Sequence, residues 1–159
     1  MAKRRSTFSP TQFLTQLAEQ RRLWEPLIEF DPRSRHYMRL AAEPDVEAWL
    51  LTWLPGQGTK WHDHGGSAGA FLTVRGALTE RYAMVHRDGP PRIRPELRTV
   101  GAGMLRPFGS KHVHRVTNEG PEPAVSLHAY APALLEMNEY AVDGGRLRLV
   151  AAQRAGQSW

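Results

Sequence analysis

The 159-residue chain contains no cysteine. This absence excludes disulfide bonds, thiolate zinc sites and thiol nucleophiles together, so any bound metal must be held by nitrogen and oxygen ligands. The chain also lacks any run approaching the ~20 apolar residues of a membrane span. The N-terminus begins with Lys3, Arg4 and Arg5, but the pattern behind them is amphipathic rather than the apolar core of a signal peptide. We therefore expect a cytoplasmic protein that does not bind a membrane.

Concentrated charge is also missing, although the formal net charge is +5. The arginines are scattered along the chain, and no basic helix face interleaved with aromatic residues is visible. Solvated surface charge explains this distribution better than a nucleic-acid site, so we expect no nucleic-acid partner. The hydrophobic fraction of 41% and the charged fraction of 23% are ordinary for a globular protein. A chain of this length is expected to form one domain over residues 1–159, and we expect it to be a monomer.

The chain does contain a short helical start followed by many short strands. Ser9 is a predicted N-cap, Pro10 occupies the first helical position and Gln12 closes a capping box, so a helical segment is expected over about residues 9–30. Pro90 and Pro91 are expected in a loop, as is the segment 120–123. Runs of β-formers alternate with Gly and Pro turns at residues 46–54, 70–75, 77–85, 97–100, 113–117, 124–130 and 146–150. This spacing predicts an all-β sandwich or barrel over about residues 37–152.

Two histidine pairs are the main candidates for chemistry. His62 and His64 lie two residues apart, and His112 and His114 repeat that spacing about fifty residues later. Side chains two apart on a strand share a face, so each pair can point into the barrel. Strand geometry alone does not choose between His112 and His114. Ordinary core or surface histidines are the alternative, but paired histidines in an all-β chain favour a metal site with open coordination positions.

This pattern resembles the cupin superfamily, which implies a jelly-roll β-barrel with one or two short N-terminal helices. Gly69 stands where the first cupin motif has its glutamate ligand. The second motif fits with either His112 or His114 as ligand. The residues that fit the two motifs are Gly56, His62, His64, Gly76, Gly101, Pro107 and Gly109. A site of three neutral imidazoles leaves the metal its full charge and favours an anionic substrate as an added ligand.

Within the cupins, the chain resembles the thiol dioxygenases, specifically cysteine dioxygenase. The segments that carry the resemblance are 54–64, 114–118 and 122–132, and the match extends over about residues 37–132. It implies that His62, His64 and His114 bind Fe(II), with His112 as a neighbour. It also implies that both atoms of O2 are added to the sulfur of L-cysteine to give cysteine sulfinic acid. Imidazole ligands by themselves would also accept other divalent metals.

The resemblance assigns roles to two further sets of side chains. Ser126, His128 and Tyr130 alternate along one strand; read alone they are a polar strand face, but in the family this series is a hydrogen-bonded relay whose tyrosine hydroxyl reaches toward substrate and oxygen. Arg39, with help from Tyr37, would bind the substrate carboxylate, because a guanidinium makes paired hydrogen bonds to that group. The related 3-mercaptopropionate dioxygenases carry glutamine there, so Arg39 favours cysteine.

Two features depart from the family or lie outside its site. Mammalian cysteine dioxygenases link a cysteine to the active-site tyrosine, but Gly69 occupies that position, so Tyr130 is expected to be uncrosslinked. Asp63 points away from the two ligands that flank it and is expected to be structural. Two alternatives remain: a dioxygenase of another small thiol, such as 3-mercaptopropionate or cysteamine, and a non-catalytic cupin that senses a metal or small ligand. A sensor would be indicated by a degraded ligand set or a fused DNA-binding domain, and neither is visible.

Overall fold

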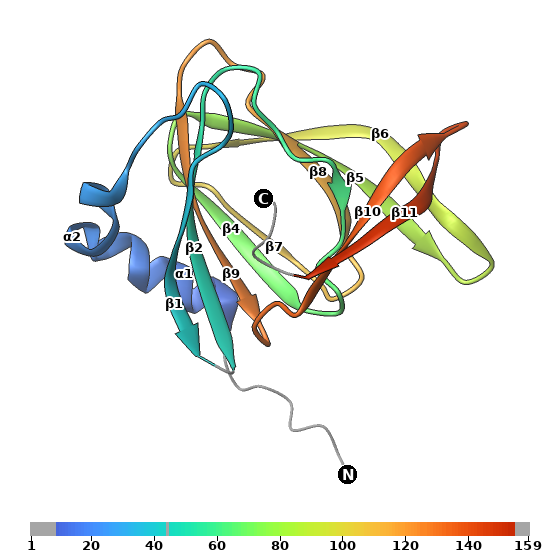
Figure 1. Cartoon of the computed structure of the whole chain (residues 1–159), viewed down its shortest axis with the longest axis horizontal. Coiled ribbons are helices and arrows are strands. Elements are labelled where there is room, and N and C mark those ends of the chain that lie inside the picture. The colour runs from blue at the N-terminus through green and yellow to red at the C-terminus, as the bar shows by residue number, and fades with distance from the viewer. Residues whose placement is uncertain (1–8, 44, 155–159) are drawn as a thin grey trace.

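The computed structural model describes residues 9–43 and 45–154, and most of the regular secondary structure in this part is β-structure built into two sheets (Figure 1). The first sheet has five strands in the order β1 (Tyr37–Glu43), β2 (Val46–Trp53), β9 (Ala124–Ala131), β4 (Ala68–Arg75) and β7 (Leu105–Phe108). The second sheet closes into a barrel in the order β10 (Glu136–Asp143), β11 (Arg146–Arg154), β6 (Gly89–Gly101), β5 (Ala77–His86), β8 (Val113–Thr117) and β3 (Trp61–His62). The predicted all-β barrel is confirmed.

Short helices precede the barrel, as the sequence predicts. Helix α1 (Pro10–Glu19) begins at Ser9, whose Oγ accepts a hydrogen bond from the backbone N–H of Gln12 at 3.3 Å, with proline in the first turn. A one-turn helix α2 (Arg21–Trp24) and the 3₁₀ helix η1 (Glu25–Leu27) follow. None of the helices in the described ranges is long and apolar enough to cross a membrane.

Strand β9 is buried along its whole length because both of its faces are covered. One face carries Val125, Leu127 and Ala129, which pack with Leu14, Leu17 and Trp24 of the helices. Figure 1 shows α1 lying along the outer side of this sheet. The opposite face carries Ser126, His128 and Tyr130 into the barrel interior, where Tyr130 joins a second apolar cluster with Trp49, Trp53 and Phe71. The helices therefore cover the apolar face of β9, and the polar face of the same strand points into the barrel interior.

The predicted strand positions are largely right, with one loop prediction wrong. Strand β8 has the bounds that the sequence predicts, and residues 120–123 lie in a loop. Pro90 and Pro91, however, belong to β6, at the tip of the β5–β6 hairpin. The register there skips from the pair Met84–Arg92 to the pair His86–Gly89, so neither proline has to donate a ladder hydrogen bond. Strands β1, β7 and β10 were not predicted.

Candidate metal centre

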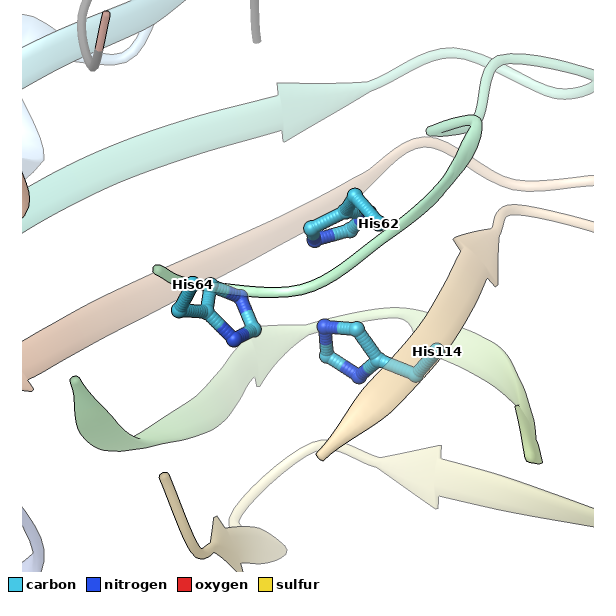
Figure 2. Close-up of side chains that lie close together, drawn as sticks. All are labelled: His62, His64 and His114. Carbon is cyan, nitrogen blue, oxygen red and sulfur yellow. The ribbon is translucent and has the colours of Figure 1, made fainter. Parts of the chain in front are cut away.

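His62, His64 and His114 converge inside the barrel, as Figure 2 shows. One ring nitrogen from each lies within 4.8 Å of those of the other two. All three imidazoles are buried, with exposures of 5%, 1% and 2%. Backbone pairing brings them together, because His62 of β3 is the ladder partner of His114 of β8. His64 follows just after β3 ends.

Each imidazole is oriented in a different way. The Nδ1 of His62 lies 2.8 Å from the backbone oxygen of Lys60, to which it donates as an N–H. The Nδ1 of His114 lies 2.8 Å from Oε1 of Glu80 and donates to that carboxylate. His64 is held instead by stacking on Phe108, with ring centroids 4.7 Å apart and planes 19° from parallel. In His62 and His114 the lone pair is therefore on Nε2.

The three-histidine set fits a divalent transition metal ion. Neither ring nitrogen of His64 has a hydrogen-bond partner within the described residues, although both are buried. An unpaired buried polar group costs about 1–3 kcal/mol, and a cation bound to one of these nitrogens would remove that cost at that nitrogen. Burial, followed by the neighbouring imidazoles, lowers the pKa of both His62 and His64 well below the usual value. The rings are therefore neutral, which is the form that binds metal.

Asp63, between the two ligands, is turned away from the cluster as the sequence predicts. Its carboxylate accepts hydrogen bonds from the backbone N–H of Gly65, from Nδ2 of Asn138 and from the hydroxyl of Tyr140, the last at 2.7 Å. These contacts tie the segment that carries both histidines to strand β10. Asp63 thus has a structural role in fixing the ligand loop.

A buried polar cluster lies behind His114. Glu80 of β5 has no exposed surface, and its two carboxylate oxygens contact His114, His112 and Arg106. Burial alone would raise the pKa of Glu80, but the hydrogen bonds from these three side chains hold it well below its usual range. His112, which strand geometry could not separate from His114, belongs to this cluster: its Nε2 lies 2.8 Å from Glu80 Oε1.

The three inward side chains of β9 form a hydrogen-bonded series. The indole N–H of Trp53 donates to Oγ of Ser126 at 2.8 Å, and that oxygen lies 2.8 Å from Nε2 of His128. A longer contact of 3.5 Å joins Nδ1 of His128 to the Tyr130 hydroxyl. Because an indole only donates, the serine proton is directed to His128 Nε2, which places the imidazole proton on Nδ1, facing Tyr130.

Burial fixes the charge states along this series. It lowers the pKa of His128 to about 3, with the neighbouring His114 and Arg35 adding to the effect. Burial likewise raises the pKa of the Tyr130 phenol above its ordinary value. At neutral pH the imidazole and the phenol are therefore both uncharged, and Tyr130 is a hydrogen-bond donor rather than a phenolate.

A cavity of about 380 Å³ leads from the surface to His62. Its lining includes Arg35, Gln57, Thr59 and Met137. The Cζ of Arg35 lies 4.9 Å from the ring centroid of Trp53, and its Nη1 is buried without a hydrogen-bond partner among the described residues. Burial lowers the pKa of Arg35 to about 10, so it remains a cation at neutral pH.

Tyr37 and Arg39, which the resemblance assigned to the substrate carboxylate, lie on β1, further along the chain than Arg35. Tyr37 is half-buried and packs on the interior cluster, with its ring 6.0 Å from that of Trp49. Arg39 is exposed, and its Cζ lies 5.7 Å from the Trp49 ring. Neither lines the cavity that reaches His62. The structure thus brings together the three histidines and the Ser126–His128–Tyr130 series, and it places Arg35, but not Arg39, in the lining of the cavity.

Gly69 has no room for a side chain. A Cβ placed there would lie 2.7 Å from two ring carbons of Phe108 and 2.7 Å from the backbone oxygen of Ala129. Phe108 thus fills the space beside Tyr130, at 6.3 Å between ring centroids, and stacks on His64. The glycine is required by the aromatic residue that supports the metal ligand.

We predict that Gly69→Ala destabilises the protein by about 1–3 kcal/mol, the usual cost of overpacking a filled core. Gly109→Ala is the matched control, because a Cβ at Gly109 meets nothing within 4 Å. Chemical denaturation of both variants measures the difference. Equal stability of the two variants would contradict the packing account of Gly69.

Four contributors to the site were not identified from sequence: Arg35, Trp53, Glu80 and Phe108. Glu80 had a usable signal, because it falls in a predicted strand two residues after Leu78, on the face that otherwise reads as apolar. Phe108 and Arg35 had none, since their roles depend on long-range packing. Arg35 precedes the first residue of β1, where no strand was predicted.

Comparisons with known proteins agree with this arrangement. A family model described as "Cysteine dioxygenase type I" matches residues 12–143. No curated protein matches the chain significantly. Among solved structures, a Thermus thermophilus protein is 24% identical over 68% of this chain and 92% of its own, with a TM-score of 0.57. An uncharacterised double-stranded β-helix protein from Klebsiella pneumoniae is 15% identical over 80% of this chain and 93% of its own, with a TM-score of 0.58. A cupin superfamily protein from Desulfitobacterium hafniense is 13% identical over 70% and 89%, with a TM-score of 0.56. These three likenesses establish the cupin fold.

Proposed function

Because the chain belongs to the cysteine dioxygenase type I family, we propose that it adds both atoms of dioxygen to the sulfur of L-cysteine and releases cysteine sulfinic acid. One observation supports this most directly: three neutral imidazoles form a buried cluster, in which His64 has no hydrogen-bond partner among the described residues and His62 lines a cavity that also holds the half-buried Arg35. The substrate sulfur supplies all the electrons that reduce dioxygen, so the reaction needs no external reductant.

Iron(II) is the metal that we propose for His62, His64 and His114. When bound, it supplies coordination positions for the thiolate and for dioxygen and lowers the pKa of the substrate thiol. The three ligands carry no charge, so an anionic thiolate is favoured over neutral ligands at the remaining positions. The chain's own contribution is to hold three neutral imidazoles in a buried, fixed arrangement.

We assign the substrate carboxylate to Arg35. Its guanidinium lines the same cavity as His62, and its Nη1 has no partner among the described residues, so a carboxylate there would gain a charge-assisted hydrogen bond and satisfy a buried donor. Tyr37, the first residue of β1, lies two residues after Arg35 and would support Arg35 in this role. Arg39, the residue that the sequence favoured for this role, is exposed and stacks near Trp49.

Tyr130 is the proposed hydrogen-bond donor to the oxygen atoms that are transferred. Trp53, Ser126 and His128 fix the orientation of its hydroxyl through the series of hydrogen bonds described above. A neutral phenol can stabilise negative charge that develops on oxygen without transferring its proton. Its role is therefore electrostatic rather than that of a base.

The experiment that tests this function is anaerobic loading of the apoprotein with iron(II), followed by oxygen-uptake measurements with separate thiols. L-Cysteine, 3-mercaptopropionate and cysteamine are compared, and the products are identified by mass. We expect the highest kcat/KM with L-cysteine and a product heavier by two oxygen atoms. No thiol-dependent uptake by iron-loaded protein would reject the function, and a preference for cysteamine, which has no carboxylate, would reject the role of Arg35.

A further inference from the structure

Glu80 is the most deeply buried charged side chain close to the three histidines, with no exposed surface. It projects from the middle of β5, where the ladder to β8 pairs it with Val116. A carboxylate buried in a strand is costly unless its oxygens are fully paired. Each oxygen of Glu80 is indeed paired, and one of them contacts a metal-ligand candidate directly.

The contacts of Glu80 are divided between its two oxygens. Oε1 accepts from Nδ1 of His114 and from Nε2 of His112, both at 2.8 Å. Oε2 accepts from Nε of Arg106 at 2.5 Å. Since an ionised carboxylate only accepts, the proton of the neutral His114 ring must be on Nδ1.

We propose that Glu80 is a positioning residue that sets the orientation and donor strength of His114 toward the metal, and that Arg106 compensates its charge. The proposal rests on the metal site of the proposed function and assigns the carboxylate behind it. A carboxylate that accepts from the far nitrogen of a ligating histidine fixes the ring and makes the near nitrogen a stronger donor.

The three ligand candidates differ in what orients their rings, and for His114 it is the charged side chain of Glu80. His62 is oriented by the neutral backbone oxygen of Lys60, and His64 by stacking on Phe108. Within the described part of the chain, His114 is the ligand candidate whose ring hydrogen-bonds to a full charge. Changing the charge at position 80 should therefore alter the metal site mainly through His114.

Arg106 and His112 complete this cluster. Arg106 is mostly buried and compensates the charge of Glu80, so that the carboxylate is not left unpaired in the protein interior. His112 stacks on the face of Phe108, with ring centroids 5.3 Å apart, and Phe108 in turn stacks on His64. The cluster thus links the support of His114 to the support of His64.

The test measures cobalt(II) binding to apoprotein variants by competition with a chelator, together with the cobalt absorption spectrum. Glu80→Ala is expected to weaken binding by roughly 10–100-fold, the usual effect of losing such a partner, and to alter the spectrum. Glu80→Gln keeps an acceptor for His114 Nδ1 and removes the charge, so it should bind with intermediate affinity. Because no thiol or oxygen is involved, the result does not depend on whether the protein oxidises cysteine.

Arg106→Gln separates positioning from folding. It disturbs the same buried cluster but leaves Glu80 free to accept from His114, so cobalt affinity should be kept or increased even where the melting temperature falls. If Glu80→Ala and Glu80→Gln bind cobalt as the unmodified protein does, or if Arg106→Gln weakens binding as much as Glu80→Ala, Glu80 is merely structural and the proposal is wrong. Variants that fold too poorly to titrate are replaced by Glu80→Asp, for which a shortened reach to His114 should also weaken binding.

Discussion

Replacing His64 with leucine is expected to abolish stoichiometric metal binding and, at the same time, to stabilise the apoprotein. Both ring nitrogens of His64 are buried without partners within the described residues, so leucine removes two unsatisfied polar atoms at similar volume. Relief of such a cost should raise the free energy of unfolding by about 1–3 kcal/mol. Metal affinity should fall by more than the roughly 10–100-fold seen when a ligand's supporting partner is lost. Metal analysis and chemical denaturation of chelator-treated protein provide the two measurements.

The matched control is His112→Leu. His112 hydrogen-bonds to Glu80 and lies outside the three-histidine set, so this variant should retain metal with only a small loss of affinity. The comparison also tests a rival arrangement, because Glu80, His112 and His114 form a second group close enough to hold a cation. Loss of metal in His112→Leu, with retention in His64→Leu, would place the metal in that second group instead. A stabilised apoprotein would show that the site is maintained at the expense of stability.

Local sequence patterns predicted the fold and the histidines well because both are properties of strand alternation. His62 and His64 share a face by spacing alone, and Ser126, His128 and Tyr130 alternate along one strand in the same way. The resemblance to a known family then selected His114 over His112. The structure gives the physical reason, since His114 is the ladder partner of His62.

Spacing could not predict features that depend on how strand ends and side chains pack across the barrel. Phe108 and Gly69 are far apart in sequence, yet they occupy one space between β7 and β4. Pro90 and Pro91 were predicted to lie in a loop. They are accommodated in β6 by a skipped register in its pairing with β5, which the local sequence does not show. Arg35 was missed for a similar reason: it lies before β1, but the ladder continues past the strand through the bond from Thr52 N–H to the His36 oxygen.

Because the ladder extends past β1, both Arg35 and Arg39 are candidates for binding the substrate carboxylate. Arg35, Tyr37 and Arg39 alternate along the same edge, so all three can face the interior side of β2. Arg39 lies opposite Trp49 and stays exposed, whereas Arg35 lies over Trp53, whose indole also begins the series that leads to Tyr130. Position along the edge, rather than residue type, therefore separates a surface cation from one inside the cavity.

Arg35→Leu is expected to lower kcat/KM for L-cysteine by roughly a hundredfold or more, because hydrogen bonds to a charged group contribute about 1.5–3 kcal/mol each and about 1.4 kcal/mol is a factor of ten. The loss should fall mainly on KM, with iron content unchanged. Cysteamine, which has no carboxylate, should lose far less. Arg35→Lys keeps the charge but not the planar pair of donors, so it should recover only part of the activity. Steady-state oxygen uptake with both thiols gives these values.

Arg39→Leu is the matched control, since it removes the same group from the same edge at an exposed position. It should change kcat/KM for L-cysteine only a few-fold. A large loss in Arg39→Leu together with a small one in Arg35→Leu would transfer the carboxylate to Arg39, as the sequence suggested. In that case Arg35 would be held in the interior by its contact with Trp53 alone, and its buried Nη1 would be an unsatisfied donor that the fold tolerates. A loss of iron in Arg35→Leu would instead make Arg35 a structural support of the metal cluster, because a residue that only binds substrate has no effect on metal content.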